Sequence, residues 1–246
     1  AHKFGRGVVK IDDFSYEFQT AMFAKQDEMN KAIINLETKF NEKYPNVKAP
    51  KIVVLPSVVK KQDLDKSISL ENVSIGIRKS KVNTCHFDFE KNIVTPIIAS
   101  TIENEIGFVY GLIDSLLDIP NVTVRVIDLL DIFDTNCSKA TCFKNDFDDL
   151  IQKIAIELNN DETKVGKNVF IFLGISKFKQ LLSLDVKNIY NEVFSKIAEK
   201  NNNKFIIMDN YTQFKDIESE MWFRSNVDMT TGIWLGGNVA NQMSLK

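Results

Sequence analysis

The feature that most constrains the fold is an alternation of short apolar runs with longer amphipathic segments. The clearest run is Val169–Leu173, which is uninterrupted by polar residues and stops at Gly174. Strands without a polar residue at every second position are typical of parallel sheets that are buried on both faces. Further runs of similar character follow along the chain, at Ile93–Ala99, Val122–Ile127, Phe205–Met208 and Gly232–Leu235.

The segments between these runs have the spacing of helices. After a cap at Asn145 or Asp146, apolar residues recur every three or four positions as far as Leu158, which is the pattern of a helix with one buried face. Strands that alternate with helices imply crossover connections and helices on both faces of the sheet. The sequence therefore predicts an α/β fold with a mostly parallel central sheet. The other expected helices are Ile106–Leu117, Val186–Lys200, Phe214–Phe223 and, earlier in the chain, about Asp27–Tyr44.

The chain is interpreted as a single domain of residues 1–246. Its length and its 44% of hydrophobic residues are enough for one sizeable core. Residues 1–60 hold the early helix and short strands at Tyr16–Phe23 and Lys51–Leu55, and we expect them to form an extension that packs on a core of residues 70–246. Pro96 lies inside one apolar run, which argues against a fully paired central strand at that point.

Charge and cysteine content exclude several classes of protein. The 31 basic and 33 acidic residues give a net charge of -2, whereas a nucleic-acid-binding domain is expected to carry a basic stripe. The apolar runs are too short to cross a membrane. The three cysteines, Cys85, Cys137 and Cys142, are an odd number, which favours a reducing compartment over a disulfide framework.

The loop between the Ile93–Ala99 strand and the following helix is where a phosphate would bind in such a sheet. A working phosphate loop needs glycines, a lysine for the terminal phosphates and a hydroxyl for magnesium. When Ser100 is placed in the first glycine position, Glu105 takes the last glycine position, Ile106 replaces the lysine and Gly107 replaces the hydroxyl residue. Glu103 and Glu105 would add negative charge beside the phosphates, and like charges a few ångströms apart repel by about 1 kcal/mol even in water.

The acidic half of a nucleotide-hydrolysing site is also missing from its expected place. A carboxylate at the end of the buried strand would hold the metal and polarise the attacking water, but Val169–Leu173 runs into Gly174. Because both halves are lost together, we expect weak or no binding of ATP and magnesium, no cofactor, no metal site and no catalytic residue.

Several short motifs in a fixed order resemble those of a known family, the FtsK/SpoIIIE-type ATPases. Within that family the chain is most similar to the third, C-terminal ATPase domain of type VIIb secretion coupling proteins. The motifs span nearly the whole chain. They are Gly5-Arg6-Gly7, Glu17-Phe18-Gln19-Thr20-Ala21, Leu55-Pro56, Ser74-Ile75-Gly76-Ile77 and Gly232-Ile233-Trp234-Leu235-Gly236.

The resemblance implies a three-layer RecA-like P-loop NTPase fold with a degenerate nucleotide site. It also implies a parent protein that is a membrane-anchored motor with several ATPase domains on the cytoplasmic side of a bacterial membrane. Such motors export WXG100-type proteins, and the start at Ala1 is consistent with a domain excised from one of them. The expected role of this domain is substrate recognition or control of export. Its expected partners are WXG100-type and other type VII substrates and neighbouring ATPase domains, in a possible hexamer of the parent, with no nucleic acid.

Two other functions stay open at this point, an active ATPase or DNA translocase that uses an unrecognised loop and a structural spacer in a hexameric motor.

Alternative interpretations also exist for single residues. Trp222 and Phe223 are expected in the core, and only if exposed would they be protein contacts. Close packing of a helix on the sheet is the expected reason for Gly107 and Gly111. A zinc site at Cys137 and Cys142, and a nucleophile–base pair at Cys85 and His86, are less favoured than ordinary packing.

Overall fold

The computed structural model describes residues 6–11, 14–20, 24–47, 54–159, 166–197, 202–237 and Leu245. The chain divides into two compact units, Ala1–Ile52 and Val53–Lys246. In unit 1 the described residues form the antiparallel hairpin β1 (Arg6–Ile11) and β2 (Phe14–Gln19) and the helix α1 (Met29–Lys43). The predicted early helix is therefore confirmed. The expected packing of residues 1–60 on the core stays a prediction, and residues 21–23 and 51–53 of the two predicted strands lie outside the described residues.

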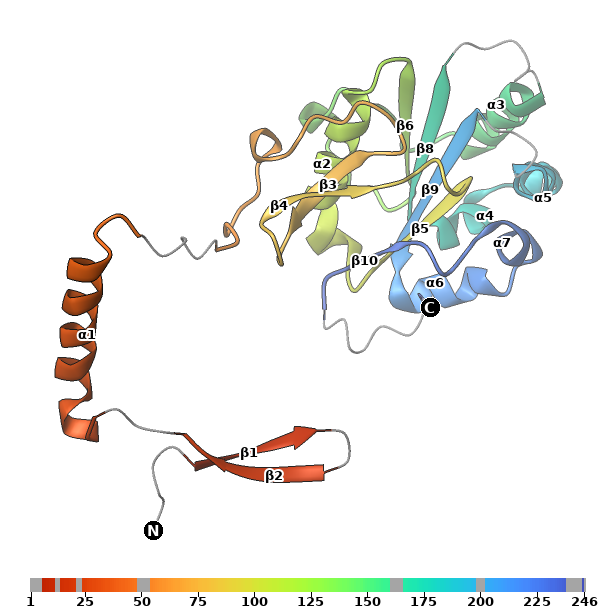
Figure 1. Cartoon of the computed structure of the whole chain (residues 1–246). Coiled ribbons are helices and arrows are strands. Elements are labelled where there is room, and N and C mark those ends of the chain that lie inside the picture. Colours follow the sequence, from red (N-terminus) through yellow and green to blue (C-terminus); the bar gives the residue numbers. More distant parts are fainter. Residues whose placement is uncertain are drawn as a thin grey trace. The chain divides into compact units, whose positions relative to one another are not determined.

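The described part of unit 2 is built on a six-stranded sheet in which every pairing is parallel, in the order β10-β5-β9-β8-β6-β7. Figure 1 shows these strands with helices on either side. The predicted α/β fold with a parallel central sheet is confirmed. The strands are β5 (Val94–Ala99), β6 (Val122–Asp128), β7 (Thr141–Phe143), β8 (Lys167–Leu173), β9 (Asn203–Asn210) and β10 (Ile233–Leu235).

One face of the sheet is covered by α2 (Ile106–Leu117) and by a second antiparallel pair, β3 (Val73–Arg78) and β4 (Asn83–Phe87). The other face is covered by helices that follow β6, β8 and β9. Side chains of each strand alternate between the two cores, so that Phe170 and Phe172 enter one and Ile171 enters the other. The helices of the second face are α3 (Phe147–Asn159), α4 (Phe178–Leu181), α5 (Lys187–Ser195), α6 (Tyr211–Glu218) and α7 (Met221–Asn226).

Pro96 is accommodated because β5 has neighbours of unequal length. β9 pairs with the whole of β5, but β10 pairs only from Ile97 to Ala99. The proline therefore lies just before the stretch of β5 that pairs with β10, which agrees with the restriction expected from its missing amide.

The strand order reverses at the carboxyl end of β5. The connection after β5 leads to α2 on one face, whereas the connection after its neighbour β9 leads to α6 on the opposite face. Ligands of open α/β sheets bind at such switch points, outside the carboxyl ends of the strands. The predicted loop at Ser100–Gly107 begins at this switch point.

Candidate functional site

The loop after β5 is a short helical segment rather than an open turn. A 3-10 helix, Ile102–Glu105, runs directly into α2. The structure brings the five predicted residues Ser100, Glu103, Glu105, Ile106 and Gly107 together in this loop and the first turn of α2. Glu103 and Gly107 are exposed, while Glu105 and Ile106 are half-buried.

Three backbone amides of the loop donate to groups of the protein itself. Ser100 N donates to the carbonyl of Leu235 at 3.0 Å, and Asn104 N donates to the carbonyl of Thr101 at 3.2 Å. Ile102 N donates to the side-chain oxygen Oδ1 of Asn210 at 2.7 Å. Phosphate loops work because their amides are free to donate to the phosphate oxygens. Here these three donors are engaged, and the Ile102 side chain is fully buried beneath them.

The carboxylate of Glu105 lies against the end of β10. A Cβ atom built on Gly236 would lie 2.6 Å from Oε1 of Glu105 and 2.5 Å from Oγ of Ser100. Gly236 has φ +69°, a left-handed conformation that favours glycine. A glutamate and a serine thus occupy the side of the loop that faces the neighbouring strand.

Gly174 ends β8 in a conformation that few other residues adopt. Its φ is +82°, and a Cβ atom built there would lie 2.6 Å from Leu130. Its amide donates to the carbonyl of Met208 at 2.8 Å. The position therefore carries no carboxylate, and a side chain there would be strained and would collide with a neighbour.

A carboxylate does lie at this edge, but it belongs to β9. Asp209 is buried and accepts hydrogen bonds from the amides of Ser176 and Asn210, each at 2.8 Å. Burial raises the pKa of Asp209 above its usual value, although the bonds from Ser176 and Asn210 act in the opposite direction. Asp209 and Asn210 tie the loop after β8 and the loop after β5 to the same strand end. Sequence reasoning missed both, although a polar pair that directly follows the apolar run Phe205–Met208 is the signal that could have found them.

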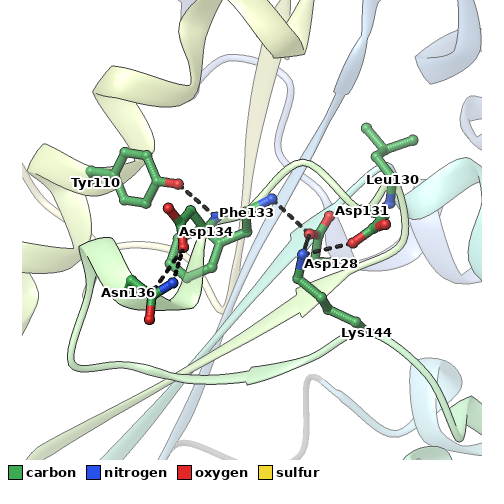
Figure 2. Close-up of polar contacts among 8 residues, drawn as sticks. All are labelled: Tyr110, Asp128, Leu130, Asp131, Phe133, Asp134, Asn136 and Lys144. Carbon is green, nitrogen blue, oxygen red and sulfur yellow. Dashed lines mark hydrogen bonds and ion pairs between the residues drawn. The ribbon is translucent and has the colours of Figure 1, made fainter.

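A second polar cluster lies at the carboxyl end of β6 (Figure 2). The side chain of Asp128 is fully buried and accepts from Phe133 N at 2.7 Å and from Leu130 N at 3.2 Å. Lys144 Nζ lies 3.5 Å from Asp128 and 2.6 Å from Asp131. Because the two amides and the lysine compensate its buried charge, Asp128 fixes the loop that follows β6.

Of the described cysteine side chains, Cys142 lies next to this cluster and Cys85 lies on β4, while the side chain of Cys137 is outside the described residues, so the zinc alternative at Cys137 and Cys142 stays a prediction. Cys142 and Cys85 are free thiols, and burial, reinforced by Asp128, raises the pKa of Cys142 to about 11. A thiol with so high a pKa is a poor nucleophile and a poor metal ligand at neutral pH. No group of three or more His, Cys, Asp or Glu residues among the described ones could hold a metal ion.

The glycines of α2 do not have the role that was expected. A Cβ atom built on Gly107 or Gly111 would meet no heavy atom within 4 Å, so close packing of the helix on the sheet is wrong as their explanation. The buried face of α2 instead consists of the larger residues Val109, Leu112, Ile113 and Leu116. Both glycines are exposed, and they line a groove of about 400 Å³ between α2 and the segment before β3.

Trp222 and Phe223 belong to the core. They are 5% and 3% exposed, and the Trp222 ring packs 4.6 Å from the ring of Phe194. The condition for a contact role, exposure of both rings, is not met. The residue beside them, Met221, is 83% exposed.

Met221 lies in a groove of about 670 Å³ between α5 and α7. One edge of Trp222 reaches this groove, where its Nε1 donates to Glu220 at 2.8 Å, and Lys179 lies 3.4 Å from the same carboxylate oxygen. Apart from Met221 and Trp222, the side chains that line the groove are polar and can form hydrogen bonds. The lining residues of α5 and of the end of α7 are Asn191, Glu192, Ser195, Ser225 and Asn226.

None of the described helices combines the length and the apolar character that a membrane span requires.

No protein-family model matches the sequence, and no curated protein matches it. Similarity is found among solved structures. The cytoplasmic domain of the type VII secretion ATPase EccC from Thermomonospora curvata superposes with a TM-score of 0.61 at 15% identity, over 98% of this chain and 31% of that one.

Two further structures match over 98% of this chain. ATPases 2 and 3 of Thermomonospora curvata EccC, solved in complex with a signal sequence peptide, superpose with a TM-score of 0.59 at 13% identity. The cytoplasmic domain of EssC superposes with a TM-score of 0.53 at 11% identity. This chain spans 50% and 54% of those two chains. Similarity at this level of identity establishes the fold. The chain has the α/β fold of the cytoplasmic ATPase domains of type VII secretion, as the resemblance implied.

Proposed function

We propose that this chain is a catalytically inactive ATPase-type domain of a type VII secretion coupling protein, with a role in substrate recognition and in control of export. The observation that carries the proposal is the closed loop after β5. Its amides at Ser100, Ile102 and Asn104 already donate to protein groups, and Glu105 occupies its flank. A nucleotide would have to break these bonds and bring its phosphates beside a carboxylate.

The chemistry of the loop supports the same conclusion. Ile106 is half-buried at the position of the lysine, and Gly107 has no hydroxyl to offer a magnesium ion. Gly174 could not be replaced by a carboxylate residue without strain and a collision with Leu130. Phosphoryl transfer depends on positioning and on charge neutralisation, and this loop supplies neither. The domain therefore binds ATP and magnesium weakly or not at all, and it needs no cofactor.

The groove between α5 and α7 is the surface we assign to substrate recognition. An amphipathic helix binds when its apolar face enters an apolar groove and its polar residues meet the rim. Met221 and the edge of Trp222 provide the apolar floor, and Lys179 and Glu220 contribute to the rim. The occupant would be the helical tail of a WXG100-type or another type VII substrate. A related pair of ATPase domains has been solved with a signal sequence peptide, which supports this class of ligand.

The parent protein would be a membrane-anchored motor with several ATPase domains on the cytoplasmic side, which can assemble as a hexamer. Neighbouring ATPase domains of that chain are the second class of partner. The similar structures are longer than this chain, which spans 31% of the EccC cytoplasmic domain. This difference in length supports a parent protein with several domains.

Substrate binding is tested by calorimetry with purified WXG100-type proteins from the same genome. The wild-type chain should bind at least one of them, and Met221→Glu should weaken binding by at least about tenfold, which corresponds to about 1.4 kcal/mol. Leu184→Glu is the matched control, because Leu184 is 81% exposed and does not line the groove. Absence of binding to every candidate, or equal losses in the two variants, would contradict the assignment.

Catalytic inactivity is tested separately by steady-state phosphate release. The chain should release no more phosphate than a protein-free sample, while an intact ATPase domain assayed in parallel turns over. Magnesium-dependent turnover at the rate of the intact domain would favour the active ATPase instead. Deleting the domain from the parent separates the spacer from the receptor, because loss of a spacer impairs export of all substrates alike.

A further inference from the structure

Asp209 is a buried acid whose two carboxylate oxygens are both engaged by the protein. It lies near the end of β9 and is 1% exposed. Its Oδ1 accepts from the amide of Asn210 and its Oδ2 accepts from the amide of Ser176, each at 2.8 Å. The side chain of Ser176 also hydrogen-bonds to this carboxylate. Because a buried acid is costly without such bonds, Asp209 and the segment that follows β8 hold each other in place.

The segment that this carboxylate holds leads directly to one wall of the groove between α5 and α7. Ser176 lies in a 3-10 helix that continues without a break into α4. Three residues after Ser176, Lys179 lines the groove and lies 3.4 Å from the carboxylate of Glu220. Because Ser176 and Lys179 belong to consecutive helical turns, a displacement of Ser176 moves Lys179 as well.

The other wall of the groove starts from the same strand end. The helix α6 begins directly after β9, contacts the 3-10 helix after β8, and is followed by α7 with Met221 and Trp222. Glu220 lies just before α7, and its Oε2 accepts from Nε1 of Trp222 at 2.8 Å and from Lys179 at 3.4 Å. The end of β9 is thus the common origin of the two segments that bring Lys179 and Glu220 together.

We propose that Asp209 is a positioning residue for this groove. It holds Ser176, and the helical segment after β8 then places Lys179. Lys179 in turn keeps Glu220 oriented toward the indole N–H of Trp222. The inference rests on the proposed function for the use of the groove, but the geometry that it describes belongs to the protein without a substrate.

The test is the exchange of the Trp222 indole proton with water, followed by NMR on the whole chain with isotope-labelled tryptophan. The chain has two tryptophans, and Trp234→Phe assigns their two indole signals. Asp209→Ala removes both acceptor oxygens and should speed the exchange of Trp222 at least about tenfold, because the groove wall opens locally. Asp128→Ala is the matched control, because Asp128 is also buried at a strand end and accepts from two amides, but it holds the loop after β6. It should change the exchange by less than about twofold.

A double variant shows whether Asp209 acts through Lys179. Lys179→Met should speed the indole exchange by itself. Adding Asp209→Ala to it should change the rate by less than about twofold, because the two substitutions interrupt the same chain of contacts. Asp209→Asn keeps one acceptor oxygen and should have a smaller effect in the same direction. It decides the matter if Asp209→Ala does not fold.

Equal effects of Asp209→Ala and Asp128→Ala, or unchanged exchange in both Asp209 variants, would overturn the proposal. Independent, multiplicative effects of Asp209→Ala and Lys179→Met would also overturn it. The measurement needs no substrate, so its outcome is separate from that of the proposed function. If the indole of Trp222 responds as expected while no WXG100-type protein binds, the positioning role stands and the proposed receptor role fails.

Discussion

The bond between Asn210 and the loop after β5 gives the sharpest test of the closed site. Asn210→Ala removes the acceptor of Ile102 N, a bond of 2.7 Å that joins residues far apart in the chain. The Ile102 side chain is fully buried, so that its amide has little access to water in compensation. Leaving a buried donor unsatisfied costs about 1–3 kcal/mol.

This loss is large enough to measure. For a unit the size of residues 53–246, 1 kcal/mol changes the Tm by about 2–4 °C, so a loss of 2 kcal/mol should lower the Tm by about 4–8 °C. The measurement is urea unfolding at neutral pH, followed by far-UV circular dichroism, with a thermal scan beside it. Asn104→Ala is the control, because Asn104 is exposed in the same loop and surface substitutions change stability by less than about 0.5 kcal/mol.

The result that would refute the reasoning is a loss below about 0.5 kcal/mol for Asn210→Ala, or equal losses in the two variants. Either result would mean that water can reach the amide of Ile102, so that the amide does not depend on Asn210. The loop would then be open to an anion, and the main support for an inactive site would disappear.

Three further predictions concern Gly174 after a strand, Gly107 in α2 and the partly buried ion pairs of Glu90. Gly174→Asp should destabilise the protein by about 2–5 kcal/mol in urea unfolding, from a strained φ and a collision with Leu130. Gly107→Ala, at an open helical position, should instead stabilise it by about 0.5–1 kcal/mol; a Gly174→Asp variant as stable as the wild type would contradict this account. Burial raises the pKa of Glu90, but Lys167 and Lys204 lower it more, to below its usual 4.5. Ionised Glu90 thus adds stability above about pH 4.5 that is lost as the pH falls through its folded pKa, so Glu90→Gln should cost most at neutral pH and little in acid. A cost that does not change between pH 7 and pH 3 would count against the pairing.

Elements that depend on local pattern were well predicted from the sequence. The strands β5, β6, β8, β9 and β10 follow the apolar runs, because a strand buried on both faces needs apolar residues at every position. The early helix was also found. These features can be predicted without knowing which segments of the chain pack against them.

Elements that depend on their neighbours were missed or explained wrongly. The β3–β4 pair and the three-residue edge strand β7 have mixed composition, and only their pairing partners make them strands. Gly107 and Gly111 were expected against the sheet, but the rotation of α2 is set by its four larger apolar residues.

The sequence by itself determined the α/β class and which side chains follow the strands, because apolar periodicity and the identity of Ile106, Gly107 and Gly174 are properties of the chain. Only the tertiary structure decided that the amide of Ile102 is engaged by a distant side chain. Asn210 at the end of β9 reaches Ile102 in the loop after the neighbouring β5, and Glu105 of the same loop meets Gly236 after β10, the other neighbour of β5. Parallel pairing brings strand ends that are distant in sequence to one edge, so the groups that fill the loop come from segments that the sequence places about a hundred residues away.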